Sequence, residues 1–140
     1  MLPLILVVDD NLDMTRGLQF AFEMEGYRVV CVSDVESALN FMQRQRPDLI
    51  LSDVRLPGMD GHAFLRVVKQ DPRWRDVPFV FLTAVADWGV AVKSKSMGAD
   101  DYVVKPFQLE DLMKVVKKWT GVVEEAKVDS KQSGRQANGR

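Results

Sequence analysis

The sequence predicts an α/β fold: a (βα)5 doubly wound, five-stranded parallel sheet with helices on both faces. Short β-branched runs alternate with helix-length segments over residues 1–123, and this alternation is typical of parallel sheets. Three of the runs are almost wholly apolar, as expected for strands that are covered on both faces. With 140 residues, 46% of them hydrophobic, the chain is long enough for one domain with its own core.

Five apolar runs are the predicted strands. Valine, isoleucine and aromatic residues are common in them, and these side chains pack well on a pleated surface. The predicted strands are Leu4–Val8, Arg28–Val32, Leu49–Ser52, Phe79–Leu82 and Tyr102–Val104.

The first two predicted helices have recognisable ends. The first covers Asp13–Glu25 and stops at Gly26, a residue that suits a helix C-terminus. The second is expected to begin at Ser33, because Glu36 follows three residues later at the spacing of a capping box. Pro47 is expected to close it.

The remaining helices differ in strength. His62–Gln70 is the third, and Leu109–Thr120 is the fifth, with acidic residues in its first turn, lysines in its last turn and Gly121 after it. The fourth, Asp87–Met97, contains Gly89 and several β-branched or serine residues of low helix propensity. We therefore expect the fourth helix to be held mainly by packing.

The last residues differ in composition from the rest of the chain. Residues 124–140 contain no Leu, Ile, Phe, Tyr or Trp and are rich in Lys, Gln, Ser, Gly and Arg. Such a segment buries too little apolar surface to offset its ordering entropy. The sequence predicts a domain at 1–123 and a disordered tail, or a truncated linker, at 124–140.

The composition excludes several classes of function. The formal net charge is −1, so no electrostatic attraction to nucleic acid or to an anionic membrane is expected. The single cysteine, Cys31, excludes an internal disulfide, and the single histidine, His62, excludes a multi-histidine metal site. The longest nearly apolar stretch, Val77–Ala86, is too short for a membrane span. These observations favour a cytoplasmic protein.

The candidate functional residues stand at the ends of the predicted strands. Asp9 and Asp10 follow the first strand, and Asp53 follows the third. Thr83 follows the fourth, and Lys105 follows the fifth. Each residue alone has an ordinary explanation, such as a helix cap or a solvated lysine. Because ligands of open α/β sheets bind beyond the carboxyl ends of the strands, the set together indicates a site.

Three carboxylates in one site require a positive counter-charge. At an effective dielectric constant of about 20, two carboxylates about 4 Å apart repel by roughly 4 kcal/mol. Oxygen ligands favour a hard divalent cation, and Mg²⁺, which takes one or two carboxylates and keeps several waters, fits better than Ca²⁺. With a lysine beside the cation, an anionic phosphoryl group can approach an aspartate. The residues therefore predict Mg²⁺-dependent phosphoryl transfer to an aspartate.

Four motifs in uninterrupted order closely resemble the receiver domain of two-component response regulators. They are Leu6–Asp10, Leu51–Gly61, Phe81–Ala84 and Gly98–Phe107, and the resemblance covers Leu4–Val122. It implies a flavodoxin-like fold with strand order 2-1-3-4-5. It also implies a signalling domain rather than an enzyme, one that catalyses only its own phosphorylation and dephosphorylation.

The resemblance assigns the acceptor and the metal ligands. Asp53 matches the aspartate that takes a phosphoryl group from a phosphohistidine on a sensor histidine kinase or a phosphotransfer protein. Asp9 and Asp10 match the acidic pair that binds Mg²⁺ together with Asp53 and the backbone carbonyl of Arg55.

The resemblance also assigns contacts and a switch. Lys105, Thr83 and Ala84 match positions that contact the phosphoryl group, and the bond from Lys105 to Pro106 is expected to be cis. Tyr102 matches an aromatic residue that turns inward when Thr83 moves.

Two further positions are expected to tune dephosphorylation. Arg55 and Val85 match residues that flank the hydrolytic water in similar domains. Because valine cannot orient that water, we expect a long-lived phosphorylated state.

The output surface is expected on the fourth helix, the fifth strand and the fifth helix. There it would control an output domain or a partner protein and could support a homodimer. The chain is expected to be either a stand-alone receiver or part of a longer regulator or hybrid kinase.

Three other interpretations are weaker. A Mg²⁺-dependent phosphatase of the aspartyl-phosphate type would carry a second aspartate two residues after the nucleophile, where this chain has Arg55. A flavin-binding protein would need a Ser/Thr/Gly-rich loop in place of Asp9, Asp10 and Asn11. A receiver-like domain that only binds partners would not need a complete set of acceptor-site residues.

Overall fold

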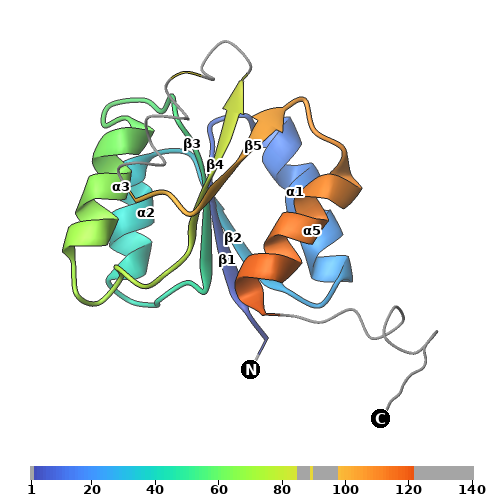
Figure 1. The fold of residues 1–140 in the computed structure, drawn as a ribbon, viewed down its shortest axis with the longest axis horizontal. Helices are drawn as coiled ribbons and strands as arrows, with labels where there is room; N and C mark the ends of the chain where they lie inside the picture. Colours follow the sequence, from blue (N-terminus) through green and yellow to red (C-terminus); the bar gives the residue numbers. More distant parts are fainter. Residues whose placement is uncertain (1, 85–88, 90–97, 122–140) are drawn as a thin grey trace.

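A parallel sheet lies between two layers of helices in the computed structural model, which describes residues 2–84, 89 and 98–121 (Figure 1). The predicted fourth helix, Asp87–Met97, and the predicted tail, 124–140, lie outside the described residues apart from Gly89. The strands are β1 (Leu4–Val8), β2 (Arg28–Val32), β3 (Leu49–Asp53), β4 (Phe79–Ala84) and β5 (Asp101–Lys105); the helices are α1 (Leu12–Met24), α2 (Val35–Met42), α3 (Gly61–Gln70) and α5 (Leu109–Thr120).

The strand order is β2-β1-β3-β4-β5, and every neighbouring pair is parallel. This confirms the predicted fold class and strand order. The order along the chain reverses at β1, which has β2 on one side and β3 on the other. Val8 is in register with Ser52, and Asp53 is in register with Leu82. The carboxyl ends of β1, β3 and β4 therefore lie side by side at the same end of the sheet.

Two apolar clusters hold the layers together. Helices α2 and α3 cover one face of the sheet and α1 and α5 cover the other (Figure 1). On the α2–α3 face, Phe79 packs edge-on against both Phe64 and Phe81, with ring centroids 5.3 and 5.0 Å apart. On the α1–α5 face, Phe22 and Leu112 are fully buried. Burial of each such side chain stabilises the fold by about 2–3 kcal/mol.

The start of α2 differs from the prediction. The capping box from Ser33 to Glu36 does not form, because Asp34 is the N-cap and its side chain accepts a hydrogen bond of 2.7 Å from the backbone N–H of Ser37. Aspartate is as good an N-cap as serine, and its charge also interacts favourably with the helix dipole. The helix ends at Met42, before Pro47 is reached.

The other ends lie close to the predicted ones. Helix α5 has its predicted bounds and ends at Gly121, whose φ of 76° is the left-handed conformation of a C-cap. Strands β3, β4 and β5 extend beyond the apolar runs, because the residues at their ends continue the backbone pairing. Among the described helices, none has the length and apolar character needed to cross a membrane.

Candidate acidic site at the carboxyl end of the sheet

Three aspartates converge where β1 and β3 end. Asp9 and Asp10 follow the last residue of β1, and Asp53 is the last residue of the neighbouring strand β3. Each of them offers a carboxylate oxygen, and these oxygens lie within 4.8 Å of one another. Asp9 is 2% exposed, Asp53 is partly buried and Asp10 is exposed. The site therefore runs from the buried end of the sheet out to solvent.

A lysine on β5, the outermost strand on one side of the sheet, contacts two of these carboxylates. Lys105 is the last residue of β5, and its Nζ lies 2.7 Å from Asp9 Oδ2 and 3.4 Å from Asp53 Oδ2. The peptide bond from Lys105 to Pro106 is cis. The ammonium thus pairs with two acidic side chains and is closer to the more buried one.

Backbone groups hold the second oxygen of each of these carboxylates. Asp9 Oδ1 accepts a hydrogen bond of 2.9 Å from the N–H of Asn11, and Asp53 Oδ1 accepts one of 3.3 Å from the N–H of Arg55. Asn11 is also the N-cap of α1. Each carboxylate is therefore oriented from both sides before any ligand arrives.

The surroundings of Asp53 disfavour its ionised form. Burial, together with the charge of Asp9, raises the pKa of the Asp53 carboxyl, and Lys105 only partly opposes this. Burial lowers the pKa of Lys105, but its hydrogen bonds and ion pairs with the two aspartates outweigh that effect, so its pKa is raised. The site therefore keeps its ammonium charged and has too little positive charge for its carboxylates.

The remaining predicted site residues lie on the neighbouring strands. Thr83, on β4, is one residue past the register partner of Asp53; it is fully buried and its hydroxyl donates to the backbone oxygen of Ala84 at 3.3 Å. Ala84 is exposed and in register with Lys105. Tyr102 lies on β5 in register with Phe81 and is partly buried.

Of the two positions predicted to tune dephosphorylation, the structure describes only Arg55. Arg55 is exposed in the connection after β3. Val85 lies outside the described residues. The structure therefore brings together Asp9, Asp10, Asp53 and Lys105, and it places Thr83 on the neighbouring strand β4, one residue past the register partner of Asp53.

Gly61, which no sequence pattern indicated as a site residue, packs directly against the backbone of Asp53. Gly61 begins α3, and its N–H donates to the backbone oxygen of Val54 at 2.8 Å. A Cβ at this position would lie 2.5 Å from the backbone oxygen of Asp53 and 2.9 Å from Val54 Cα. Gly61 stood inside a recognised motif, but no spacing rule indicated so close a backbone approach.

The arrangement suits the binding of a hard cation and of an anion. Aspartate oxygens are the ligands that Mg²⁺ prefers, and the exposed side of the site leaves room for waters. A cation there would offset the deficit of positive charge, and Lys105 would remain available to an anion.

Comparison with known proteins identifies the same type of domain. A family model described as the response regulator receiver domain matches residues 5–117. Among curated proteins, the chain is 38% identical over 113 residues to the phosphate regulon transcriptional regulatory protein PhoB of Escherichia coli, a match that covers 81% of this chain and 49% of PhoB. The chain spans less than half the length of the curated relatives it matches first.

Solved structures give the same result. A putative response regulator from Chloroflexus aurantiacus superimposes with a TM-score of 0.82 at 31% identity, over 86% of this chain and 99% of that one. The receiver domain of the sensor histidine kinase PA1611 from Pseudomonas aeruginosa, solved with a magnesium ion in its active-site cleft, has a TM-score of 0.78 at 35% identity, over 86% and 99% of the two chains.

Proposed function

The chain belongs to the response regulator receiver domain family of two-component signalling, and from that premise we propose that Asp53 accepts a phosphoryl group from a sensor histidine kinase or a phosphotransfer protein. One observation carries this proposal. Asp53 is the strand-terminal carboxylate that lies within 4.8 Å of two other aspartates and 3.4 Å from a lysine ammonium. Such a site has the charges needed to receive an anion at a carboxylate.

Mg²⁺ fits the residues of this site. Asp9, Asp10 and Asp53 would hold it, with the backbone carbonyl of Arg55 as a further ligand, and all of these donors are oxygens. The charge deficit at Asp53 favours a divalent cation, and a related receiver domain was solved with magnesium in its cleft. When bound, the ion would supply positive charge to the transferring phosphoryl group.

The residues of the chain perform the transfer itself. A carboxylate oxygen of Asp53 attacks the phosphorus atom, a P–O bond forms, and the P–N bond to the donor imidazole breaks. The bonding electron pair leaves with the imidazole nitrogen, which then takes up a proton. Lys105 interacts with the phosphoryl oxygens, and the hydroxyl of Thr83 and the N–H of Ala84 donate to them.

The response to phosphorylation is proposed to pass through β4 and β5. Thr83 would exchange its hydrogen bond to the Ala84 carbonyl for one to the phosphoryl group. Tyr102, next to Phe81 across the two strands, would then move inward. The output surface would include β5 and α5 and act on an output domain, a partner protein or a second copy of the chain. Arg55 and Val85 would slow hydrolysis of the phosphorylated form.

Phosphate uptake from acetyl phosphate tests the proposal. With Mg²⁺ present, mass spectrometry should detect one added phosphoryl group on the wild-type chain and none on Asp53→Asn. Asp76→Asn removes an exposed carboxylate outside the site and should behave as the wild type. Equal labelling of Asp53→Asn and wild type would disprove the assignment of Asp53.

A further inference from the structure

A cavity opens on the α2–α3 side of the molecule, apart from the acidic site. It has a volume of about 620 Å³ and lies between helix α2 and the connection that precedes α3. Cavities of 300–1,000 Å³ are typical of binding sites. Its lining residues are Asp34, Glu36, Leu39, Asn40, Pro57, Gly58 and Met59.

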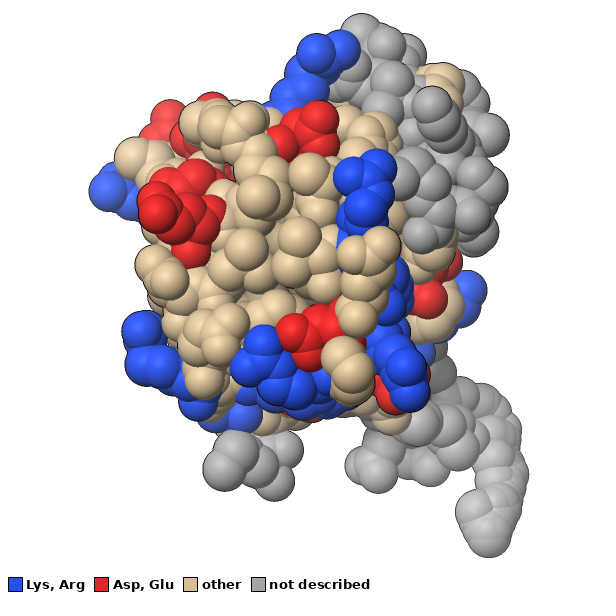
Figure 2. Space-filling model, turned by 90° about the vertical axis from the view of Figure 1, so that its left-hand side faces the viewer, with Lys and Arg blue, Asp and Glu red and all other residues tan. Residues whose placement is uncertain are grey.

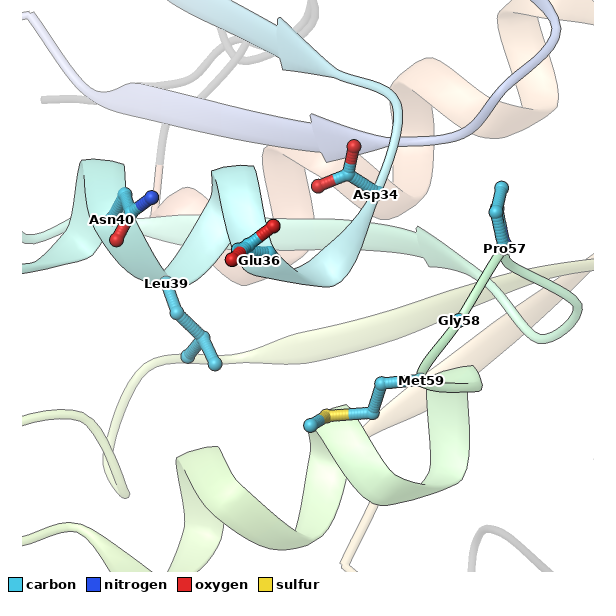
Figure 3. Close-up of a pocket in the computed structure, with 7 residues that line it drawn as sticks. All are labelled: Asp34, Glu36, Leu39, Asn40, Pro57, Gly58 and Met59. Carbon is cyan, nitrogen blue, oxygen red and sulfur yellow. The ribbon is translucent and has the colours of Figure 1, made fainter.

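The lining combines an apolar part with carboxylates. The side chains of Leu39 and Met59 extend toward one another from α2 and from the loop (Figure 3), and Pro57 of the same loop also lines the cavity. The carboxylates of Asp34 and Glu36 lie above, at the first turn of α2 (Figure 3). Met59 is 42% exposed, which leaves apolar surface uncovered.

The charge around this cavity is negative. Two of its lining residues, Asp34 and Glu36, are acidic, and none of them is basic. Hydrogen bonds from Ser37 lower the pKa of Asp34, so this carboxyl stays ionised at neutral pH. On this face of the molecule, an acidic group lies toward the upper left beside a largely uncharged central surface, and basic side chains are most frequent along the lower edge, where some acidic ones lie among them (Figure 2). The cavity therefore favours a cationic occupant.

We propose that this cavity binds a segment of a partner protein in which an arginine or lysine stands next to an aliphatic side chain. The aliphatic group would fill the space between Leu39 and Met59, and the cation would pair with Glu36 and Asp34. A protein segment fits better than a small polycation, because the apolar contacts need a hydrocarbon side chain beside the charge.

An occupant of this cavity would also affect the position of Asp53 in the acidic site. Pro57, Gly58 and Met59 belong to the connection from Asp53 to α3, and Gly61 at its end packs directly on the Asp53 backbone. An occupant of the cavity therefore contacts the loop that positions Asp53. The docking itself does not depend on phosphate transfer, and the chain with Asp53→Asn should bind as the wild type does.

An NMR titration with a defined peptide tests the proposal. The probe is a short acetylated peptide with two Arg-Leu pairs separated by alanine, added to the ¹⁵N-labelled, unphosphorylated full chain. We expect the largest shifts at the amides of α2 and residues 56–60, with smaller ones at Asp53. Glu36→Gln and Met59→Ser should each weaken binding about 3- to 10-fold, and higher salt should weaken it further.

Two matched variants control for general effects of charge and exposed apolar surface. Glu110→Gln removes an acidic residue from the first turn of α5, and Leu109→Ser removes an apolar side chain that is 46% exposed. Neither should change the affinity. The proposal is wrong if the peptide causes no shifts at millimolar concentration or shifts only the acidic site. It is also wrong if a peptide with Glu in place of Arg binds equally well, or if spermidine reproduces the same shifts.

Discussion

Lys105 Nζ lies 2.7 Å from Asp9 Oδ2, whereas its distance to Asp53 Oδ2 is 3.4 Å. Asp9 is almost fully buried, and its side chain is only 1% exposed. The shorter ion pair therefore neutralises the carboxylate that water cannot reach. The longer one leaves Asp53 only partly compensated, at the position where we propose that an anion is received.

Removal of this ammonium should destabilise the fold. Lys105→Met leaves the buried Asp9 carboxylate without its ion pair, and breaking a buried pair costs about 3–5 kcal/mol in free energy of unfolding. Because Lys105 is itself partly exposed, we expect a value of about 3 kcal/mol or below. Urea unfolding at pH 7 without Mg²⁺ measures it.

A charge-neutral double variant separates the ion pair from general packing. In Lys105→Met with Asp9→Asn, the loss should be smaller than the sum of the two single losses. Addition of Mg²⁺ should stabilise Lys105→Met more than the wild type, because the cation supplies the missing charge. Additive losses in the double variant would contradict the importance of this pair.

The close approach of Gly61 to Asp53 predicts a strong effect of a single methyl group. Gly61→Ala places a Cβ 2.5 Å from the Asp53 backbone oxygen, so the β3–α3 connection must shift. We expect a loss of about 2 kcal/mol or more in free energy of unfolding, together with slower phosphorylation from acetyl phosphate. The measurements are urea unfolding and the rate of phosphate uptake.

Gly17→Ala is the matched control. Gly17 is an exposed residue of α1, and a Cβ there would meet nothing within 4 Å. Because alanine is the better helix former, this variant should gain about 0.5–1 kcal/mol. A similar response of the two variants would show that the contact with Asp53 is not what constrains Gly61.

Asp100 anchors the start of β4. Its Oδ2 accepts a 2.8 Å hydrogen bond from the N–H of Phe79 and lies 3.1 Å from Lys69 Nζ. Asp100→Ala leaves that buried N–H without this acceptor, and we expect a loss of about 2 kcal/mol in thermal or urea unfolding. Asp100→Asn keeps an oxygen for Phe79 and should lose less. An equal loss in both variants would assign the effect to the charge pair with Lys69.

The thiol of Cys31 should be slow to react in the folded chain. Burial, with a contribution from Glu23, raises its pKa from 9.0 to about 11. At pH 9 the folded chain then holds about 50-fold less thiolate than the unfolded chain, and alkylation by iodoacetamide should slow accordingly. Labelling rates measured with and without denaturant test this.

The same shift determines a dependence of stability on pH. Because the folded pKa of Cys31 is the higher one, its contribution is fully present below pH 9 and is lost as the pH rises toward about 11. The free energy of unfolding of the wild type should therefore fall more steeply over that range than that of Cys31→Ala. Parallel curves would mean that the thiol titrates alike in both states.

Sequence patterns predicted the elements that depend on local chemistry. The bounds of β1, β2 and α5 agree with the prediction, because apolar runs and a C-terminal glycine determine them locally. The predicted start of α2 was wrong. Ser33 and Asp34 are both good N-caps, and only the backbone conformation decides between them.

The sequence was sufficient to predict that the acidic residues lie together. It was not sufficient to predict which of their carboxylates pairs most closely with Lys105. Strand ends of a parallel sheet meet at one edge, so Asp9, Asp10 and Asp53 were expected together. Which carboxylate Lys105 prefers depends on how far its side chain reaches across β4, and this is a tertiary property. The contact beneath Asp53 likewise depends on the docking of α3 against β3.

The position of β5 in the described sheet has a consequence for communication through the molecule. This strand has a neighbour on one side only, yet it carries the cation that forms ion pairs with Asp9 and Asp53. A molecule that displaces this edge strand would thereby alter the affinity of the centre for an anion, and an anion bound at the centre would alter the affinity for that molecule by the same factor. The ion pairs of Lys105 thus connect the edge strand directly to the acidic site at the middle of the sheet.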